Sequence, residues 1–232
     1  MHIELPACFR RTTHGRIAVT TLDRYGQSAG KLPGFNPEKE PIAPQRPHAS
    51  SHSIRLIQMS RAYLLGALHD ATEREYTYRL SQNDSQYVET VVSIVASLGF
   101  DAWTYQEGEN RDMYVVEFAK TVLDGFEVAS AEEKRAYARG YFDADGSVPK
   151  DPSARFYVYF AQSDKADLRE LKTYLGELGI ETGTLHQPSA DNAPEYWRFY
   201  VSANSHKAFA EKVGSLHPRK RQMLREMRRS MP

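Results

Sequence analysis

The feature that most constrains the fold is an internal repeat, which begins near Met59. The segment EYTYRLSQND returns as RFYVYFAQSD, and a helical stretch that ends SLGF returns as one that ends ELGI. Gln82 and Gln162 are eighty positions apart, as are Gly99 and Gly179. Self-similarity of this kind is the signature of a duplicated structural unit. The repeat therefore predicts two similar units and a pseudo-twofold molecule.

Each copy reads as helix, strand, helix, two strands and helix, which places the chain in the α+β (mixed αβ) class. The strand segments 76–82 and 156–162 are rich in aromatic and β-branched residues. Asp84 and Asp164 stand where helix N-caps belong, and Ser130 begins a capping box, SAEE. The predicted organisation is an extended or partly disordered arm at 1–54, a first unit at 55–124, a linker at 125–132, a second unit at 133–216 and a basic C-terminal tail at 217–232.

Composition excludes several classes of protein. No apolar run approaches about 18 residues, so we expect no membrane-spanning helix and no membrane partner. The N-terminus lacks the apolar core of a signal peptide. Cys8 is the only cysteine, which excludes an internal disulfide framework and a multi-cysteine zinc site. A reducing, cytoplasmic setting is the default expectation, in association with the nucleoid if the partner is DNA.

Charge is balanced in total but unevenly distributed. A net charge of zero argues against non-specific binding to nucleic acid. The segment from His217 to Arg229, however, has six basic residues against Glu226 alone. A basic tail suits contacts to phosphate groups, which position a protein on DNA without specifying sequence.

The first 54 residues differ from the rest of the chain in composition and in hydrophobic pattern. They hold six prolines with scattered glycine and serine, and they show no sustained periodicity. This composition favours a linker or tail, with a short strand at 15–22. The alternative is an arm that follows DNA through Arg10, Arg11 and Arg16.

Two helices at equivalent repeat positions carry small residues four positions apart. Ala62 and Gly66 form this pair in the first copy, and Ala136 and Gly140 form it in the second. Positions i and i+4 share one helix face, so each stripe lets another backbone approach closely. The alternative is two unrelated amphipathic helices. If the two helices pack on each other, the acidic residues that end them converge at the pseudo-twofold axis.

The convergence of these acids needs a physical reason, because carboxylates at helix C-termini oppose the helix dipole. Divalent cations neutralise such clusters, and oxygen ligands suit Mg²⁺. A calcium EF-hand is the competing interpretation of Asp143-Ala-Asp145-Gly146. It fails on spacing, since position twelve from Asp143 is Ala154 rather than a glutamate.

The segment GYFDADG at 140–146 closely resembles the LAGLIDADG signature of homing endonucleases, and LLGALHD at 64–70 looks like a diverged first copy. The resemblance covers about residues 59–217. Two motifs in one chain resemble the single-chain, pseudo-symmetric branch of the family, which acts as a monomer. The resemblance implies two αββαββα units, with the motif helices packed at the centre and antiparallel sheets forming a saddle for double-stranded DNA.

The resemblance also implies a metal site. In family members the last acid of each motif binds a divalent metal, here Mg²⁺, beside the scissile phosphate. That acid corresponds to Asp145 in the second motif. In the first motif Ala71 stands at that position and Asp70 precedes it. One residue is about 100° of helical rotation, so Asp70 reaches the site only if the helix end unwinds differently, and Glu73 is the alternative.

Three further residues acquire catalytic roles through the resemblance. Gln82 and Gln162 end equivalent strands and resemble a glutamine that orders catalytic solvent, although either could instead cap the following helix. Lys120 resembles a basic residue placed near the scissile phosphate. His69 stands where the second motif has Asp143, and we interpret it as a structural histidine at a helix end.

Alternation in the strands predicts a polar sheet face that is free to bind a ligand. Arginine and glutamine on such a face read base edges in the major groove, and the alternative is an ordinary solvated face. The candidate DNA-binding residues are Thr77, Arg79, Ser81, Thr104, Gln106, Arg155, Tyr157, Tyr159, Thr184, His186, Arg198 and Tyr200.

The function expected from these features is a sequence-specific, metal-dependent double-strand DNA endonuclease that is encoded by a mobile intron and cuts a long pseudo-palindromic site. An intein origin is disfavoured, because no splicing-type residues begin or end the chain. The alternatives on the same fold are a nickase, an RNA maturase that binds intron RNA, or a non-catalytic DNA-binding regulator. A metal-dependent enzyme of small phosphorylated substrates is disfavoured by the lack of a Gly-rich phosphate loop.

Overall fold

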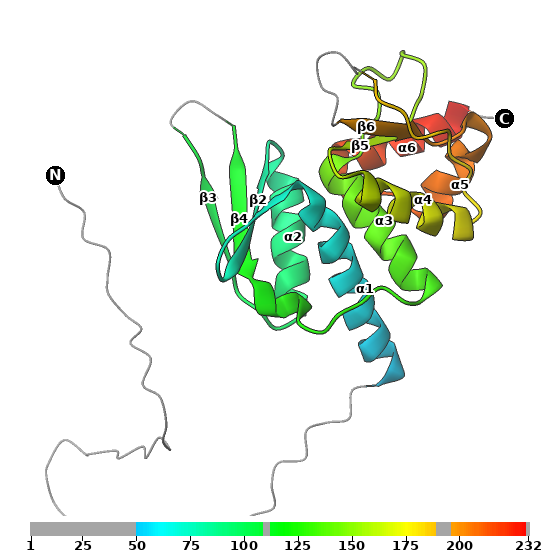
Figure 1. The fold of residues 1–232 in the computed structure, drawn as a ribbon. Helices are drawn as coiled ribbons and strands as arrows, with labels where there is room; N and C mark the ends of the chain where they lie inside the picture. Colours follow the sequence, from blue (N-terminus) through cyan, green and yellow to red (C-terminus); the bar gives the residue numbers. More distant parts are fainter. Residues whose placement is uncertain (1–49, 109–111, 189–195, 231–232) are drawn as a thin grey trace, which may run out of the picture. The chain divides into compact units, whose positions relative to one another are not determined.

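The computed structural model describes residues 50–108, 112–188 and 196–230 (Figure 1). The predicted arm up to residue 49, with the strand at 15–22 and the three arginines of the DNA-following alternative, lies outside the described residues. None of the described helices is long and apolar enough to cross a bilayer.

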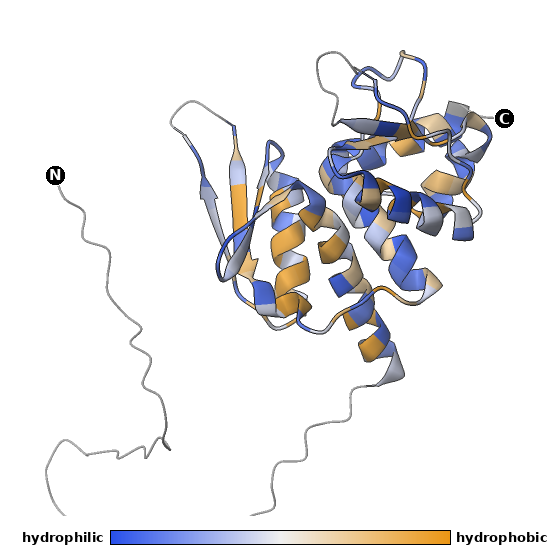
Figure 2. Cartoon of the chain, in the orientation of Figure 1, coloured by the Kyte–Doolittle hydropathy of each residue, from blue (hydrophilic) through white to orange (hydrophobic). Residues whose placement is uncertain are grey.

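The first unit is a four-stranded antiparallel sheet with helices on one face. Its strand order is β1-β2-β4-β3, and α2 packs on the sheet with α1 beside it (Figure 1). Hydrophobic residues gather on α2, on α1 and on the sheet face beneath them (Figure 2). Its elements are α1 (Ser51–Ala67), the 3-10 turn η1 (Leu68–Asp70), β1 (Ala71–Glu73), β2 (Thr77–Gln82), α2 (Ser85–Ser97), β3 (Ala102–Gln106), β4 (Tyr114–Ala119) and the 3-10 turn η2 (Lys120–Leu123).

The second unit repeats this arrangement with a smaller sheet. Strands β5 and β6 pair antiparallel, while the segments that correspond to the other two strands form only the isolated bridges Ser147–Tyr159, Thr182–Val201 and His186–Arg198. The structure is thus of the mixed α and β class with antiparallel sheets, as predicted. Its elements are α3 (Ala131–Asp145), β5 (Tyr159–Gln162), α4 (Lys165–Glu177), β6 (Trp197–Tyr200), η3 (Ala203–Ser205), α5 (His206–Lys212) and α6 (Pro218–Ser230).

Helix starts follow the predicted caps. The side chain of Asp84 accepts a hydrogen bond from the backbone N–H of Tyr87 at 3.0 Å, and Asp164 caps α4 in the same way. Ser130 and Glu133 form a complete capping box at the start of α3. These bonds satisfy backbone donors that the first helical turn leaves without partners.

The two motif helices, α1 and α3, pack on each other through their glycines. A Cβ atom on Gly66 would lie less than 3.0 Å from the backbone of Tyr137, and one on Gly140 would lie less than 3.0 Å from the backbone of Tyr63. Ala62 and Ala136 are buried beside these contacts. The small-residue stripes therefore mark a helix–helix interface, as the sequence predicts.

The same interface carries a reciprocal pair of polar contacts. Tyr63, three residues before Gly66, donates its hydroxyl to Asp143 of α3 at 2.8 Å. Tyr137, three residues before Gly140, bonds through its hydroxyl to Nε2 of His69 at 2.5 Å. Each helix thus anchors the end of the other, and the arrangement is pseudo-twofold.

The C-terminal segment is a helix rather than the basic tail predicted from the sequence. Met223, Leu224 and Met227 of α6 are buried in the core. They lie at helical spacing, so one face of this basic segment is apolar. The high density of arginine and lysine in the sequence hides that narrow apolar stripe.

We expect Gly66→Ala and Gly140→Ala to destabilise the protein by more than about 2 kcal/mol each, because backbone atoms of the facing helix must move. The matched control is Gly176→Ala in α4, where a Cβ meets no atom within 4 Å. Alanine there is expected to stabilise by about 0.5–1 kcal/mol. Urea unfolding followed by circular dichroism measures all three, and equal effects would contradict a glycine-dependent interface.

Candidate active site

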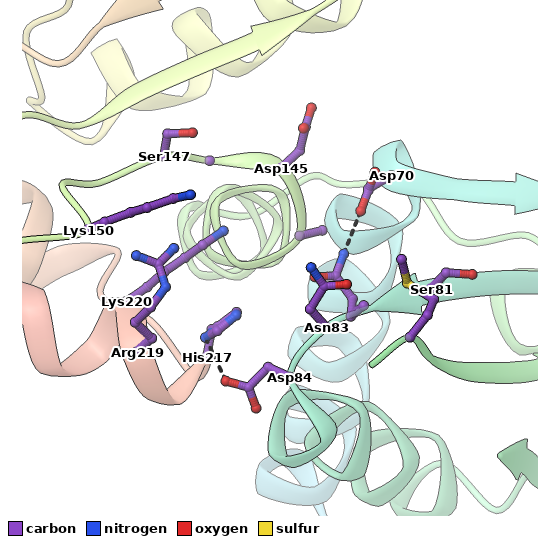
Figure 3. A pocket seen from close by; sticks show the side chains of 14 residues that line it. Asp70, Ser81, Asn83, Asp84, Asp145, Ser147, Lys150, His217, Arg219 and Lys220 are labelled. Carbon is purple, nitrogen blue, oxygen red and sulfur yellow. Dashed lines mark hydrogen bonds and ion pairs between the residues drawn. The ribbon is translucent and has the colours of Figure 1, made fainter. Parts of the chain in front are cut away.

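The ends of α1 and α3 open into one cavity of about 760 Å³. Figure 3 shows acidic and basic side chains converging on it from both units. The lining residues are Asp70, Ser81, Gln82, Asn83, Asp84, Met113, Ala144, Asp145, Gly146, Ser147, Lys150, His217, Arg219 and Lys220.

Asp70 reaches the cavity because the end of α1 tightens. The α-helix stops at Ala67 and continues as a 3-10 turn to Asp70, whereas α3 stays α-helical to Asp145. A 3-10 residue rises about 2.0 Å and turns about 120°, against about 1.5 Å and 100° in an α-helix. Four residues after Gly66 therefore advance about as far along the axis as five residues after Gly140. The tighter turn offsets the residue that the first motif lacks.

Each acid accepts a hydrogen bond from the glutamine of its own unit. Gln82 donates from Nε2 to Asp70 at 2.5 Å, and Gln162 donates from Nε2 to Asp145 at 3.3 Å. Gln162 also donates to the backbone carbonyl of His69 at 3.0 Å, which ties the second unit to the end of the first motif. The glutamines thus hold both carboxylates in place.

The environment of the acids favours their protonated forms. Burial raises the pKa of Asp70 to about 6, against the opposing effects of the Lys220 charge and the Gln82 hydrogen bond. Burial also raises the pKa of Asp145 to about 7, and the charge of Asp70 adds to that rise. Two buried carboxyl groups with raised pKa values form a site where added positive charge is favourable.

Lys220 supplies a buried cation that is not evident from the sequence motifs. Its ammonium donates to the carbonyl oxygens of Phe142 at 2.7 Å and Asp143 at 2.8 Å, in the last turn of α3. Burial lowers the pKa of Lys220 to about 8, although the nearby carboxylates oppose that shift. The only sequence signal is the basic character of the C-terminal segment, which does not indicate which lysine turns inward.

The two aspartates of the second motif have different roles. Asp145 faces the cavity, whereas Asp143 is fully buried. Asp143 accepts hydrogen bonds from Tyr63, from the backbone N–H of Leu216 at 2.8 Å and from the hydroxyl of Ser215. Burial raises the pKa of Asp143, and these bonds act against that rise. Asp143 therefore connects both motif helices to the segment that leads into α6.

The cavity fits a divalent cation with few protein ligands. Among the described residues, no group of three or more His, Cys, Asp or Glu side chains is placed to hold a metal. A cation between Asp70 and Asp145 would take carboxylate oxygens and complete its shell with backbone, water or phosphate oxygens. Mg²⁺ is commonly bound in this way, through one or two carboxylates and substrate phosphates.

The remaining candidates of the first motif lie away from the cavity. The ammonium of Lys120 forms an ion pair with Glu73, and neither residue lines the cavity. The structure therefore does not bring Lys120 to the acids, and Asp70 rather than Glu73 is the carboxylate that lines the cavity. His69 bonds to Asp167 at 2.9 Å and stacks on Tyr141, which fits the structural role expected for it.

On the first sheet, the strand register corrects part of the predicted DNA face. Thr104 pairs with Val116, whose side chain is in the core beneath the helices. Gln106 has the same parity, so Thr104 and Gln106 belong to the helix side at the sheet edge. The uncovered face instead carries Trp103 and Tyr105, which are 55% and 42% exposed, together with Thr77, Arg79 and Ser81.

Arg79 on this face is paired with carboxylates. It donates to Glu107 at 2.5 Å and to the hydroxyl of Tyr105 at 3.2 Å, and Tyr105 donates to Glu117 at 2.7 Å. Arg74 forms an ion pair with Glu117 at 3.2 Å. A ligand phosphate would have to compete with these acids for Arg79.

The second sheet carries a cluster of aromatic and basic side chains on its uncovered face. Tyr159 lies 5.6 Å from Tyr157 and 5.4 Å from Tyr200 between ring centroids. The guanidinium of Arg198 lies over the Tyr159 ring at 4.4 Å, and His186 stacks on Tyr200. Thr184 and Arg155 are exposed near this cluster. The candidates of the second unit thus gather on one face.

Among known protein families, the match falls on the second unit. A family model described as a LAGLIDADG-like domain matches residues 132–214, which run from α3 to the end of α5. The chain contains a LAGLIDADG-like domain. No curated protein matches the sequence.

Solved structures extend this LAGLIDADG-like fold over both units. The homing endonuclease I-DmoI in complex with DNA and Ca aligns over 73% of this chain and 98% of its own, with a TM-score of 0.56 and 17% identity. Its complex with DNA and Mn aligns over 69% and 99%, with a TM-score of 0.53 and 16% identity. Full-length DUF199/WhiA from Thermatoga maritima aligns over 81% and 68%, with a TM-score of 0.58 and 13% identity. At these identities the likeness shows the fold.

We expect Asp145→Asn to unfold at a higher temperature than wild type at pH 8, with little difference near pH 4. The pKa of Asp145 is raised to about 7, so its carboxyl favours the folded state at low pH and this advantage is lost as pH rises through 7. The amide can still accept from Gln162. Thermal melts at the two pH values measure the effect. A variant that melts below wild type at pH 8 would contradict the raised pKa.

Proposed function

We propose that the protein is a metal-dependent DNA endonuclease that cuts both strands of a long, pseudo-palindromic duplex site. The observation that carries this proposal is the meeting of Asp70 and Asp145 in one cavity, each held by an equivalent glutamine. Supporting it, the chain shares the fold of I-DmoI, whose structures contain DNA with Mn or Ca. The open sheet faces on the two units suit a duplex.

The residues at and around the cavity would have different roles in phosphodiester hydrolysis. A divalent cation, when bound, would polarise the phosphate and lower the pKa of attacking water. Asp70 and Asp145 would hold that cation through carboxylate oxygens. Gln82 and Gln162 keep the two carboxylates oriented through their amide N–H groups. Lys220 adds a fixed positive charge close to both acids.

The finer features of the proposal follow from the repeat and the charge of the site. Mg²⁺ is the proposed metal because the donors are oxygen atoms. Two units in one chain present two halves of a site, so the protein would act as a monomer. An intron-encoded homing role and a cytoplasmic, nucleoid-associated location are proposed with it.

A second candidate is a nucleic-acid-binding protein that does not cut, acting on DNA as a regulator or on intron RNA as a maturase. Two observations favour it. No three His, Cys, Asp or Glu side chains of the described residues are placed to hold a metal together, and Lys120 does not line the cavity. The fold also matches DUF199/WhiA as well as it matches I-DmoI. A nickase, in which only the Asp145 site cuts, lies between the two candidates.

A cleavage assay distinguishes these functions. Supercoiled plasmids that carry a library of long random targets are incubated with Mg²⁺ and with wild type, Asp145→Asn, Asp70→Asn or the control Asp101→Asn, an exposed acid outside the cavity. We expect wild type and the control to linearise part of the library. Asp145→Asn should lose more than about a hundredfold in rate, as removal of a charge-stabilising group does.

The other outcomes are equally informative. Nicked circles alone from wild type would indicate a nickase. Recovery of bound target without any cleavage would replace the endonuclease with the binding protein. If Asp70→Asn cuts both strands normally, then Asp70 is not a metal ligand.

A further inference from the structure

One wall of the cavity carries basic side chains and lies apart from the acids. Lys150, Arg219 and Lys220 line it together with His217, and Figure 3 shows these side chains on the side opposite Asp70. Three of the four come from residues 217–220, which lie beyond the residues that match the LAGLIDADG-like domain. We call the four residues the basic corner.

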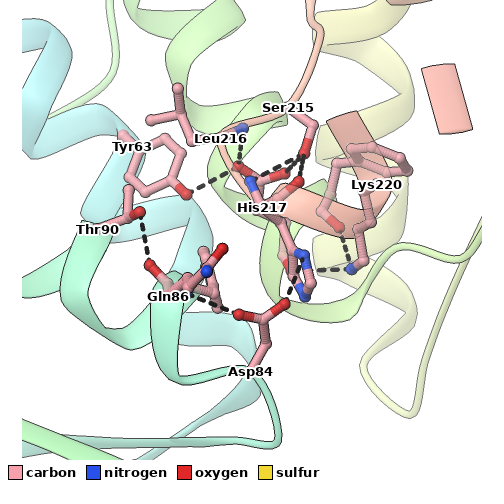
Figure 4. A network of polar contacts seen from close by, with 11 residues as sticks. Tyr63, Asp84, Gln86, Thr90, Ser215, Leu216, His217 and Lys220 are labelled. Atoms are coloured by element: carbon pink, nitrogen blue, oxygen red, sulfur yellow. Dashed lines mark hydrogen bonds and ion pairs between the residues drawn. The ribbon is translucent and has the colours of Figure 1, made fainter. Parts of the chain in front are cut away.

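Two residues of the basic corner, His217 and Lys220, are held in position by buried polar contacts. Figure 4 shows the network that joins Tyr63, Ser215, Leu216 and His217. Asp143 accepts from Leu216 and Ser215, and the hydroxyl of Ser215 in turn accepts from the backbone N–H of His217 at 3.0 Å. Lys220 bonds to the last carbonyls of α3. His217 and Lys220 are therefore tied to the end of α3, and Asp143 links this segment to both motif helices.

The basic corner has unused binding capacity. Among the described residues, no carboxylate forms an ion pair with Arg219 or Lys150, and both side chains are exposed. The side chain of His217 is only 8% exposed, yet its Nδ1 atom has no hydrogen-bond partner. The nearest acid, Asp84, is 3.7 Å away, which is too long for a hydrogen bond. A buried polar atom without a partner at a cavity wall calls for a ligand or water.

We propose that Arg219 and Lys150 bind a backbone phosphate of duplex DNA beside Asp70 and Asp145, with the buried Lys220 and His217 forming the wall behind it. This inference rests on the proposed function, because that function makes DNA the ligand. Arginine offers a planar set of donors that matches phosphate oxygens. A phosphate held here would sit between a basic wall and an acidic wall, where a divalent cation can join it to the carboxylates.

The corner also makes the two halves of the cavity unequal. On the side of the first unit the lining residues Asn83 and Met113 are uncharged, and Asp84 is acidic. A phosphate is therefore held better on the side of Asp145. The two strands of a bound duplex would meet different surroundings.

The test measures binding and needs no cleavage. Wild type, Arg219→Gln and Arg225→Gln, as full-length proteins, are titrated into a fluorescent duplex of about 30 base pairs and random sequence, in EDTA, between about 50 and 200 mM salt. Arg225 is exposed on the same helix and does not line the cavity. Each lost phosphate contact reduces the slope of log K against log salt by about 0.9. We expect a reduction of up to about 0.9 for Arg219→Gln, completed but not doubled when Lys150→Gln is added because both residues contact one phosphate, and no reduction for Arg225→Gln.

Each result decides the question. If wild type binds the duplex and Arg219→Gln keeps the wild-type slope, or changes it no more than Arg225→Gln, the basic corner is overturned while the proposed function stands. If wild type binds no duplex DNA, both fail together. Lys220→Met serves as a further variant only if circular dichroism shows it folded, since Lys220 is buried.

Discussion

The close approach of two helix backbones at Gly66 and Gly140 is the constraint on which the rest of the structure depends. Any Cβ atom at either position would enter the backbone of the facing helix. This contact sets the distance between α1 and α3, and thereby the distance between the acids that end them. The tyrosines three residues earlier bond across to Asp143 and His69, which fixes the helix ends as well as the helix centres.

The electrostatic problem created by this packing is handled by distributing the charge. Asp145 faces the cavity, while Asp143, two residues earlier, is buried and accepts hydrogen bonds from three donors. Lys220 bonds to the last carbonyls of α3, where a positive charge is favourable for the helix dipole. The raised pKa values of Asp70 and Asp145 show that Lys220 does not fully offset the cost of ionising these acids. Binding of a further cation in the cavity is therefore favourable. A cluster that is costly to ionise is common where carboxylates are used for chemistry.

The two units share a plan but present different surfaces. The uncovered face of the first sheet carries an ion network around Glu117, and that of the second carries a stack of tyrosines with Arg198. Likeness of fold extends to both I-DmoI and DUF199/WhiA at similar TM-scores. The fold alone thus does not select an activity, and the proposed function rests on the acids, the glutamines and the basic corner.

The sequence by itself determined the duplication, the glycine stripes, the capping residues and the resemblance of the second motif, because each depends on spacing along the chain. It also placed Asp145, Asp70, Gln82 and Gln162 at element ends. The structure brings Asp145, Asp70 and Gln82 to one cavity, with Gln162 bonded to Asp145. Only the tertiary structure decided the rest. The face of Thr104 depends on its register with β4, and the reach of Asp70 depends on a 3-10 turn. Lys220, and not Lys120, lines the cavity because α6 packs on the core, and contacts between residues 142 and 220 leave no local pattern in a sequence.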